Sequence, residues 1–229
     1  MRVYYMTTAN WAETILQERR LKQSRFFESN DPFELMLIDS RNQYVRKISK
    51  MIATHHNKTI GMLCFGKTWS SPVMWAHYAE KHTGVCLGFE VEDKQLTEVA
   101  YTDDKIKVEF GEHLPRHGLS AELLNRVLTT KATDWRYEQE VRALAELKTP
   151  DPSNGLYYTD FGEQIQLREI IIGHRCEWTI AHVIAMLGDV VTPVRICKAR
   201  PAFGSFQMIE QQRPRSVTVK PPLLSAQGQ

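Results

Sequence analysis

The chain has 229 residues, 42% of them hydrophobic and 24% charged, and a formal net charge of +2 at pH 7. This is the composition of an ordinary soluble globular protein, long enough for one generous domain or two small ones. Its first residues, MRVYYMTTANW, contain no apolar signal core, and no apolar run approaches the ~18 residues that a membrane span requires. We therefore expect a cytoplasmic protein with no membrane partner.

In chain order, the first half is predicted to begin with a strand, because RVYYM at 2–6 is rich in β-forming residues. Thr7 or Thr8 can then cap a helix to about Leu21, with Trp11, Ile15 and Leu16 facing the core. The further predicted elements are a helix from Phe33 to about His56, a strand at 59–66, a helix over 73–82 and a strand at 85–91.

The second half shows the same mixture of short strands and helices. Its predicted elements are edge strands in EVAY and IKVEF, an amphipathic helix at 119–132, strands in LYYTDF and QLREIIIG, a helix in WTIAHVIAML, and a closing hairpin formed by VRICKAR and SFQMIEQ. The tail after about Pro214 has three prolines and little apolar content, which predicts loose order over 214–229. We expect a single α+β domain over 1–213, with a mixed or antiparallel core sheet flanked by helices.

Charge is distributed unevenly along the chain. Residues 1–58 carry ten Lys or Arg and six Asp or Glu, and residues 195–229 carry six and one. Basic clusters such as ERRLKQSR (18–25) and RKISK (46–50) could face phosphates, although small clusters of this kind are more often solvated helix faces. Nucleic acid is thus one candidate partner that the sequence does not require.

Common catalytic and metal motifs are absent from the sequence. It contains no HExxH, no GxGxxG, no GxxxxGK[ST] and no GxSxG, and its eight histidines lack metal-ligand spacing. The four cysteines are scattered among apolar residues, which predicts buried free thiols. We therefore expect no metal site and neither a Rossmann nor a P-loop nucleotide site.

The segment WRYEQEVRALAEL, 135–147, contains two glutamates, Glu138 and Glu140, followed by Arg142. On a strand, the side-chain period of two would place all three on one face. A helix with an ion pair between Glu138 and Arg142 is also compatible with the spacing. On the pattern alone, a solvated face is favoured over a catalytic one.

Several motifs resemble a widespread bacterial family that is known only as a domain of unknown function. They are NDPFE (30–34), MWAHYAEKHTGVCLGFE (74–90), VAY (99–101), W-x-YE-x-E-x-R (135–142) and REIIIG (168–173). The resemblance extends from the first strand to about Met208. Membership of a family of unknown function does not indicate which reaction, if any, the protein catalyses.

A more distant resemblance is to the ADP-ribosyltransferases, carried by YYMTTANWAETILQERRLKQS (4–24) and by the Glu-x-Glu pair. Tyr5 stands where those enzymes usually have an Arg or His. The resemblance implies that Glu140 is catalytic, that Glu138 positions the acceptor, and that NAD is the substrate. It further implies NAD contacts by Tyr5, Thr7, Asn30, Asp31, Tyr78 and Arg142.

The leading hypothesis is therefore an NAD-consuming ADP-ribosyltransferase or NAD glycohydrolase, such as a bacterial toxin or phage-defence effector, with a nucleic acid or protein as acceptor. Cleavage of the nicotinamide–ribose bond creates an oxocarbenium-like ribose, which a carboxylate stabilises. One alternative is a non-enzymatic module that binds a nucleotide or nucleic acid through the basic ends of the chain. A second alternative is a metal-dependent nuclease that uses Asp31, Glu34 and the late glutamates.

Overall fold

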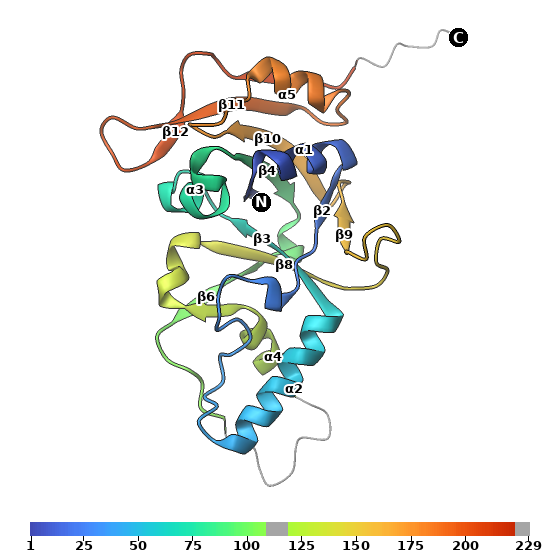
Figure 1. Cartoon of the computed structure of the whole chain (residues 1–229), viewed down its shortest axis with the longest axis vertical. Helices are drawn as coiled ribbons and strands as arrows, with labels where there is room; N and C mark the ends of the chain where they lie inside the picture. The colour runs from blue at the N-terminus through green and yellow to red at the C-terminus, as the bar shows by residue number, and fades with distance from the viewer. Residues whose placement is uncertain (109–118, 223–229) are drawn as a thin grey trace. The chain divides into compact units, whose positions relative to one another are not determined.

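The computed structural model describes residues 1–108 and 119–222 (Figure 1). The chain divides into two compact units. Unit 1 contains Met1–Leu21, Phe65–Asp93 and the chain from Asp160 onward, and unit 2 contains Lys22–Cys64 and Lys94–Thr159. Each unit is thus assembled from segments that lie far apart in the sequence. The expectation that residues 1–213 form a single domain stays a prediction.

Unit 1 is built on a mixed sheet. Its strands are β1 (Arg2–Thr7), β4 (Val85–Val91), β10 (Ile165–Ile172), β11 (Val194–Pro201), β12 (Met208–Glu210) and β13 (Val217–Val219). The order is β12-β11-β10-β4-β1, and β13 also pairs with β11. β4 is antiparallel to both of its neighbours, whereas β10 and β11 are parallel. The sheet is therefore mixed, as the sequence predicts.

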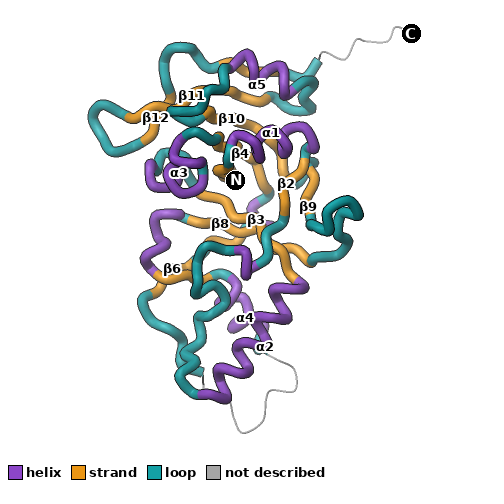
Figure 2. Tube along the Cα trace, viewed as in Figure 1, coloured by secondary structure: helices purple, strands orange, loops and turns teal. Residues whose placement is uncertain are grey.

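Three helices pack on the sheet of unit 1 (Figures 1 and 2): α1 (Ala9–Glu18), α3 (Pro72–Tyr78) and α5 (Ile180–Leu187). α1 contacts β4, α3 contacts β1, and α5 contacts β11 and α1. Thr8 caps α1 by accepting a hydrogen bond from the Trp11 N–H. One hydrophobic cluster between these elements centres on the fully buried Trp75, whose Nε1 donates to the Trp69 carbonyl oxygen at 2.6 Å.

Unit 2 combines smaller strands with two helices. Its elements are β3 (Ile60–Gly66), which runs on into unit 1, β5 (Thr97–Glu98), β6 (Ala100–Thr102), β7 (Thr130–Ala132), β8 (Glu140–Glu146), α2 (Gln43–Thr59) and α4 (Ala121–Leu128). β8 lies between β3 and β5, and β6 pairs with β7 in parallel. β2 (Arg20–Lys22) pairs with β9 (Tyr158–Asp160). Among the described residues, the 3-10 helices η1 (Phe26–Glu28) and η4 (Thr133–Glu138) belong to unit 2, η2 (Glu80–His82) belongs to unit 1, and η3 (Asp93–Gln95) lies where the chain passes from unit 1 to unit 2.

The core of unit 2 forms between α2, α4, β3 and the segment after η1. Its buried residues are Phe26, Leu35, Leu37, Ile38, Val45, Ala53, Met62, Val127 and Leu128. Asn42 caps α2 by accepting from the N–H groups of Tyr44 and Val45. No helix among the described residues is long and apolar enough to cross a membrane.

The α+β class and most elements are confirmed, and several local predictions are wrong. The helices predicted to about Leu21 and His82 end at Glu18 and Tyr78, because Arg20–Lys22 form β2 and Lys81 has a φ of 54°. The helix predicted from Phe33 begins only at Gln43, because Asn42 caps it and Leu35 has a φ of 62°, outside the right-handed helical region. Trp11 is 53% exposed, since Ala12, Ile15 and Leu16 form the buried face of α1.

The other two corrections concern the second half of the chain. The helix predicted over 119–132 ends at Leu128, because residues 130–132 pair with β6 as β7. In the segment predicted to be a loose tail, Val217–Val219 pair with Val194–Ile196 of β11. Part of the strand predicted in IKVEF and the last seven residues of the tail lie outside the described residues.

Candidate functional site

The Glu-x-Glu segment lies at the junction of η4 and β8 in unit 2. Glu138 is the last residue of η4, and Glu140 is the first residue of β8. Gln139 between them has the left-handed backbone angles φ 44° and ψ 50°. The prediction that Glu138, Glu140 and Arg142 alternate along one strand is therefore wrong for Glu138, and the helical alternative is wrong from Glu140 onward.

Glu138 and Glu140 nevertheless converge on one ammonium group. Lys131 in β7 places its Nζ 2.6 Å from Glu138 Oε2 and 2.7 Å from Glu140 Oε2. All three side chains are at most 5% exposed. Lys131 Nζ also lies 5.4 Å from the centre of the Trp135 ring. The two carboxylates thus form a buried cluster, and the prediction of a solvated charged face is wrong.

Arg142 is fully buried and joins this cluster to Glu34. Its Nε and Nη2 donate to the two oxygens of Glu140, at 2.8 and 3.2 Å. Its Nη1 and Nη2 donate to the two oxygens of Glu34, at 2.8 and 2.9 Å, and Nη1 also donates to the Leu128 carbonyl oxygen at 2.7 Å. These hydrogen bonds use all five N–H donors of a guanidinium group. We refer to Glu34, Lys131, Glu138, Glu140 and Arg142 as the buried charge cluster.

The NDPFE segment positions Glu34 for this contact. The Asp31 carboxylate accepts from the Phe33 N–H at 2.8 Å, and the Glu34 N–H donates to the Asp31 carbonyl oxygen at 3.1 Å. The Ser29 hydroxyl donates to Glu34 Oε2 at 3.3 Å. This tight turn directs the Glu34 side chain into the interior, where it is 3% exposed.

The charges of the cluster shift the pKa values of its members. Burial opposes ionisation of Glu140, but attraction by Arg142 and Lys131 outweighs burial and lowers its pKa from 4.5 to about 2. Burial likewise opposes the charged form of Lys131, yet Glu140 and Glu138 raise its pKa above the ordinary value. Glu140 is therefore a permanent carboxylate at neutral pH and cannot act as a proton donor there.

Donor groups surround the Glu140 carboxylate. Arg142 supplies two donors and Lys131 supplies one, and the thiol of Cys64 in β3 also helps to lower the pKa of Glu140. Burial and the charge of Glu140 raise the pKa of the Cys64 thiol well above its ordinary value. The backbone N–H of Glu140 donates to the Tyr101 hydroxyl at 2.8 Å. Of the groups beside the Glu140 carboxylate, the thiol is the weakest hydrogen-bond donor and is therefore the one that a ligand hydroxyl would most readily replace.

Residues 74–143 match the family described as "Protein of unknown function (DUF2971)". This segment begins in α3 and ends in β8. This match supports the predicted resemblance to a family of unknown function. The chain matches no curated protein and no solved structure. The resemblance to ADP-ribosyltransferases stays a prediction.

The DUF2971 match covers four of the residues that the sequence assigned to a site: Tyr78, Glu138, Glu140 and Arg142. It also covers Lys131, which the sequence analysis missed because a lysine in TTKATDW carries no local signal of burial. Tyr5, Thr7, Asn30 and Asp31 lie outside the match.

Within unit 2, the structure brings Glu138, Glu140 and Arg142 together. The Asp31 carboxylate does not join them and instead accepts a hydrogen bond from the Phe33 N–H in its own turn. The side chain of Asn30 is exposed, whereas Asp31 is 3% exposed.

The remaining predicted residues, Tyr5, Thr7 and Tyr78, belong to unit 1. Tyr5 packs edge-on against Phe65 with ring centres 6.2 Å apart, and Thr7 is buried opposite Val85 of β4. Tyr78 is half-buried at the end of α3 and contacts the His77 ring. Their role as NAD contacts stays a prediction.

A pocket of about 490 Å³ adjoins the buried charge cluster in unit 2. Asp31 and Glu34 lie in its wall, so one member of the cluster lines the pocket directly. The rest of the wall comes from η1, the segment after it, and one face of α2. This pocket is of the size that small-molecule sites in proteins commonly have.

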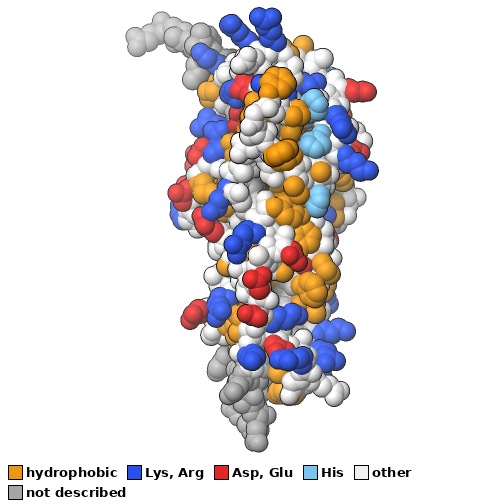
Figure 3. All heavy atoms as spheres, turned by 90° about the vertical axis from the view of Figure 1, so that its left-hand side faces the viewer, with side chains coloured by type: hydrophobic (Ala, Val, Ile, Leu, Met, Phe, Trp, Pro, Cys, Tyr) orange, Lys and Arg blue, Asp and Glu red, His pale blue; other side chains and the backbone are white. Residues whose placement is uncertain are grey.

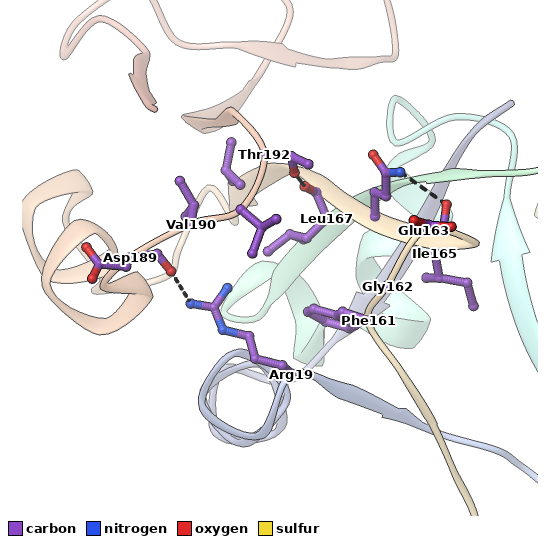
Figure 4. A pocket seen from close by; sticks show the side chains of 12 residues that line it. Arg19, Phe161, Gly162, Glu163, Ile165, Leu167, Asp189, Val190 and Thr192 are labelled. Carbon is purple, nitrogen blue, oxygen red and sulfur yellow. Dashed lines mark hydrogen bonds between the residues drawn. The ribbon is translucent and has the colours of Figure 1, made fainter. Parts of the chain in front are cut away.

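A second pocket, of about 430 Å³, lies in unit 1 (Figure 4). Arg19 reaches into its wall from the end of α1, and its Nη2 donates to the carbonyl oxygens of Leu187 and, at 3.1 Å, Asp189. Leu187 is the last residue of α5 and Asp189 follows its C-cap residue, so the guanidinium caps the carboxyl end of this helix. The structure thus gives Arg19 a structural contact, and its binding to nucleic acid stays a prediction.

Charged side chains of both signs are interspersed on the face of the molecule that Figure 3 shows, together with hydrophobic and histidine side chains. Among residues 1–108 and 119–222, no group of three or more His, Cys, Asp or Glu is placed to hold a metal ion. Cys86, Cys176 and Cys197 are buried free thiols as predicted, and Cys64 is half-buried.

Proposed function

We propose that the protein cleaves the nicotinamide–ribose bond of NAD and transfers ADP-ribose to an acceptor or to water. The observation that supports this proposal is the charge of the buried cluster. Three carboxylates, Glu34, Glu138 and Glu140, lie at the two cations Lys131 and Arg142. Glu140 is held ionised in this low-dielectric interior, where its negative charge can stabilise positive charge strongly.

The reaction develops positive charge on the ribose. Nicotinamide leaves with the electron pair of the bond to C1′, and the ribose ring acquires oxocarbenium character. Glu140 is ionised with a pKa of about 2, which suits charge stabilisation rather than proton donation. In this proposal a ribose hydroxyl replaces the Cys64 thiol on the Glu140 carboxylate.

Glu138 would act on the acceptor. An oxygen or nitrogen nucleophile forms the new bond to C1′ and loses its proton, which a carboxylate beside Glu140 can accept. Glu138 lies at the same Lys131 ammonium as Glu140, so both carboxylates can serve one substrate. Release of a reactive ADP-ribosyl group or depletion of NAD would also suit the proposed role as a toxin or phage-defence effector.

The test is release of nicotinamide from NAD, followed by chromatography, with and without nucleic acid and protein acceptors. We expect Glu140→Gln to lower the rate at least 100-fold and Glu138→Gln to reduce transfer more than hydrolysis. Glu146→Gln is the matched control, because Glu146 lies on the same strand with its side chain 76% exposed. Circular dichroism establishes that each variant is folded.

Two results would overturn the proposal. One is a folded wild-type protein that releases no nicotinamide with any acceptor. The other is full activity in a folded Glu140→Gln variant, which would show that the carboxylate charge does not contribute to the reaction.

The complete pairing of Arg142 favours a second candidate, a non-enzymatic binding module in which the cluster only stabilises unit 2. All five N–H donors of its guanidinium are already used within the protein. Under this candidate, Glu140→Gln lowers the stability of the protein but does not change ligand affinity in the folded state.

A further inference from the structure

We propose that the pocket between η1 and α2 in unit 2 binds a nucleoside monophosphate group. This concerns binding alone, and it stands whether or not NAD is cleaved at Glu140. We call the site the α2 pocket. Its volume of about 490 Å³ is within the range for small-ligand sites.

The inner wall of the α2 pocket is apolar. It is formed by side chains of the unit 2 core, namely Phe26, Leu35, Ile38 and Ala53. Phe27 and Met36 also line the pocket and are 58% and 44% exposed. Exposed aromatic and thioether groups beside an apolar wall provide a surface on which a flat ring can stack.

One face of α2 supplies cations to the same pocket. Arg46, Ser49, Lys50 and Ala53 follow the i, i+3, i+4, i+7 spacing of a single helix face, and all of them line the pocket. Arg46 is held over the segment before the helix, because its Nε donates to the Ser40 carbonyl oxygen and its Nη2 to that of Arg41, both at 3.1 Å. Within residues 1–108 and 119–222, Arg46 Nη1 and the Lys50 ammonium form no hydrogen bond or ion pair, so both can face a phosphate.

Two residues that carry acceptor groups, Asp31 and Glu34, also line the pocket, and the Asp31 carboxylate is held in place by the Phe33 N–H. A ligand that combines a flat apolar ring, amino or hydroxyl donors and an anionic group matches the apolar, acidic and basic groups of this lining. A nucleoside monophosphate has these groups, whereas an acyl-chain acid would bring no donor to the carboxylates.

The Phe27 N–H donates to Asn57 Oδ1 at 2.8 Å and so links η1 to α2, the two elements that contribute to the pocket. Because this bond and those of Arg46 are formed within unit 2, the pocket is preorganised for binding. The ligand could be a free nucleotide or the adenylate half of NAD, since both present the same chemistry.

The experiment is calorimetric titration of the full chain with AMP. We expect Arg46→Ala combined with Lys50→Ala to weaken binding at least tenfold. Lys47→Ala is the matched control, because Lys47 is an exposed cation on the same helix that does not line the pocket. Ala53→Leu, which fills the inner wall, should also weaken AMP binding.

Adenosine and ribose 5-phosphate should each bind more weakly than AMP, because adenosine lacks the phosphate and ribose 5-phosphate lacks the base. Competition by NAD would assign the pocket to its adenylate half, and AMP binding without such competition would assign a separate nucleotide site. Either result supports the proposal.

The proposal is overturned if AMP does not bind at millimolar concentration, if Lys47→Ala weakens binding as much as the double variant, or if decanoate binds more tightly than AMP. Glu140→Gln separates this proposal from NAD cleavage, because that variant should lose nicotinamide release and retain AMP affinity.

Discussion

Replacing Arg142 with methionine tests whether the buried charge cluster holds unit 2 together. The change leaves Glu34 and Glu140 buried without the guanidinium that satisfies both of them. Removing one partner of a buried ion pair typically costs about 3–5 kcal/mol, because the remaining charge stays desolvated. Lys131 still faces Glu140, so Glu34 carries the larger share of this cost.

Arg195 provides a matched control in unit 1. It too is on a strand and pairs with two carboxylates, those of Glu169 and Glu210, but its side chain is 37% exposed. Partly exposed ion pairs contribute about 1 kcal/mol or less. We therefore expect Arg195→Met to lower the free energy of unfolding far less than Arg142→Met.

Urea unfolding and calorimetry measure the two losses. For a chain of this length about 1 kcal/mol corresponds to about 2–4 °C, so Arg142→Met should lower Tm by roughly 6–20 °C. Hydrogen exchange of peptides from β8 and α4 should locate the loss in unit 2. If Arg142→Met and Arg195→Met lower the free energy of unfolding by amounts that agree within about 1 kcal/mol, burial does not determine the cost of losing these ion pairs and the prediction is wrong.

Two further predictions concern packing in unit 1. Gly84→Ala should lower the free energy of unfolding by about 1–3 kcal/mol in urea titrations, because its Cβ would lie 2.2 Å from the Thr7 carbonyl oxygen. Gly162→Ala is the control, since a Cβ there meets nothing within 4 Å, and equal losses would contradict the prediction. Phe203→Ser combined with Phe206→Ser should change stability by less than about 0.5 kcal/mol, because these rings are 96% and 99% exposed. A fall in Tm of several degrees would show that they pack against the protein.

Helices and strands were predicted well where apolar residues recur at a regular spacing and their side chains are buried. VCLGFEV at 85–91 was predicted as a strand, and β4 has the same bounds. The predicted helix from Phe33 failed at its start, because apolar residues such as Leu35 and Ile38 belong to an irregular segment that also faces the core. Periodicity cannot separate a buried irregular segment from a helix, since both bury apolar residues at similar spacing.

The candidate site was predicted only in part. Glu138, Glu140 and Arg142 were singled out, but their partner Lys131 comes from a strand that the sequence analysis assigned to a helix. Glu34 lies 108 residues from Arg142 in the chain, and no local pattern links them. The left-handed backbone of Gln139, which lets both glutamates meet one ammonium, also has no local sequence signal.

The low pKa of Glu140 gives a pH dependence with a definite sign. A carboxyl group whose pKa falls from 4.5 in the unfolded chain to about 2 in the folded one stabilises the fold above pH 4.5. That contribution, about 3 kcal/mol for such a shift, is lost as the pH falls from 4.5 toward 2. Urea unfolding between pH 7 and pH 2.5 should therefore show a steeper loss in the wild type than in Glu140→Gln.

The other carboxyl groups are present in both proteins, so the difference between the two curves isolates Glu140. Parallel curves would mean that Glu140 is not held ionised by Arg142 and Lys131. The same pKa also constrains the proposed reaction, because Glu140 stays ionised throughout the range from pH 5 to 9. Nicotinamide release should then show no loss of rate from protonation of Glu140 in that range, and any change in rate with a midpoint near neutral pH would have to come from another group.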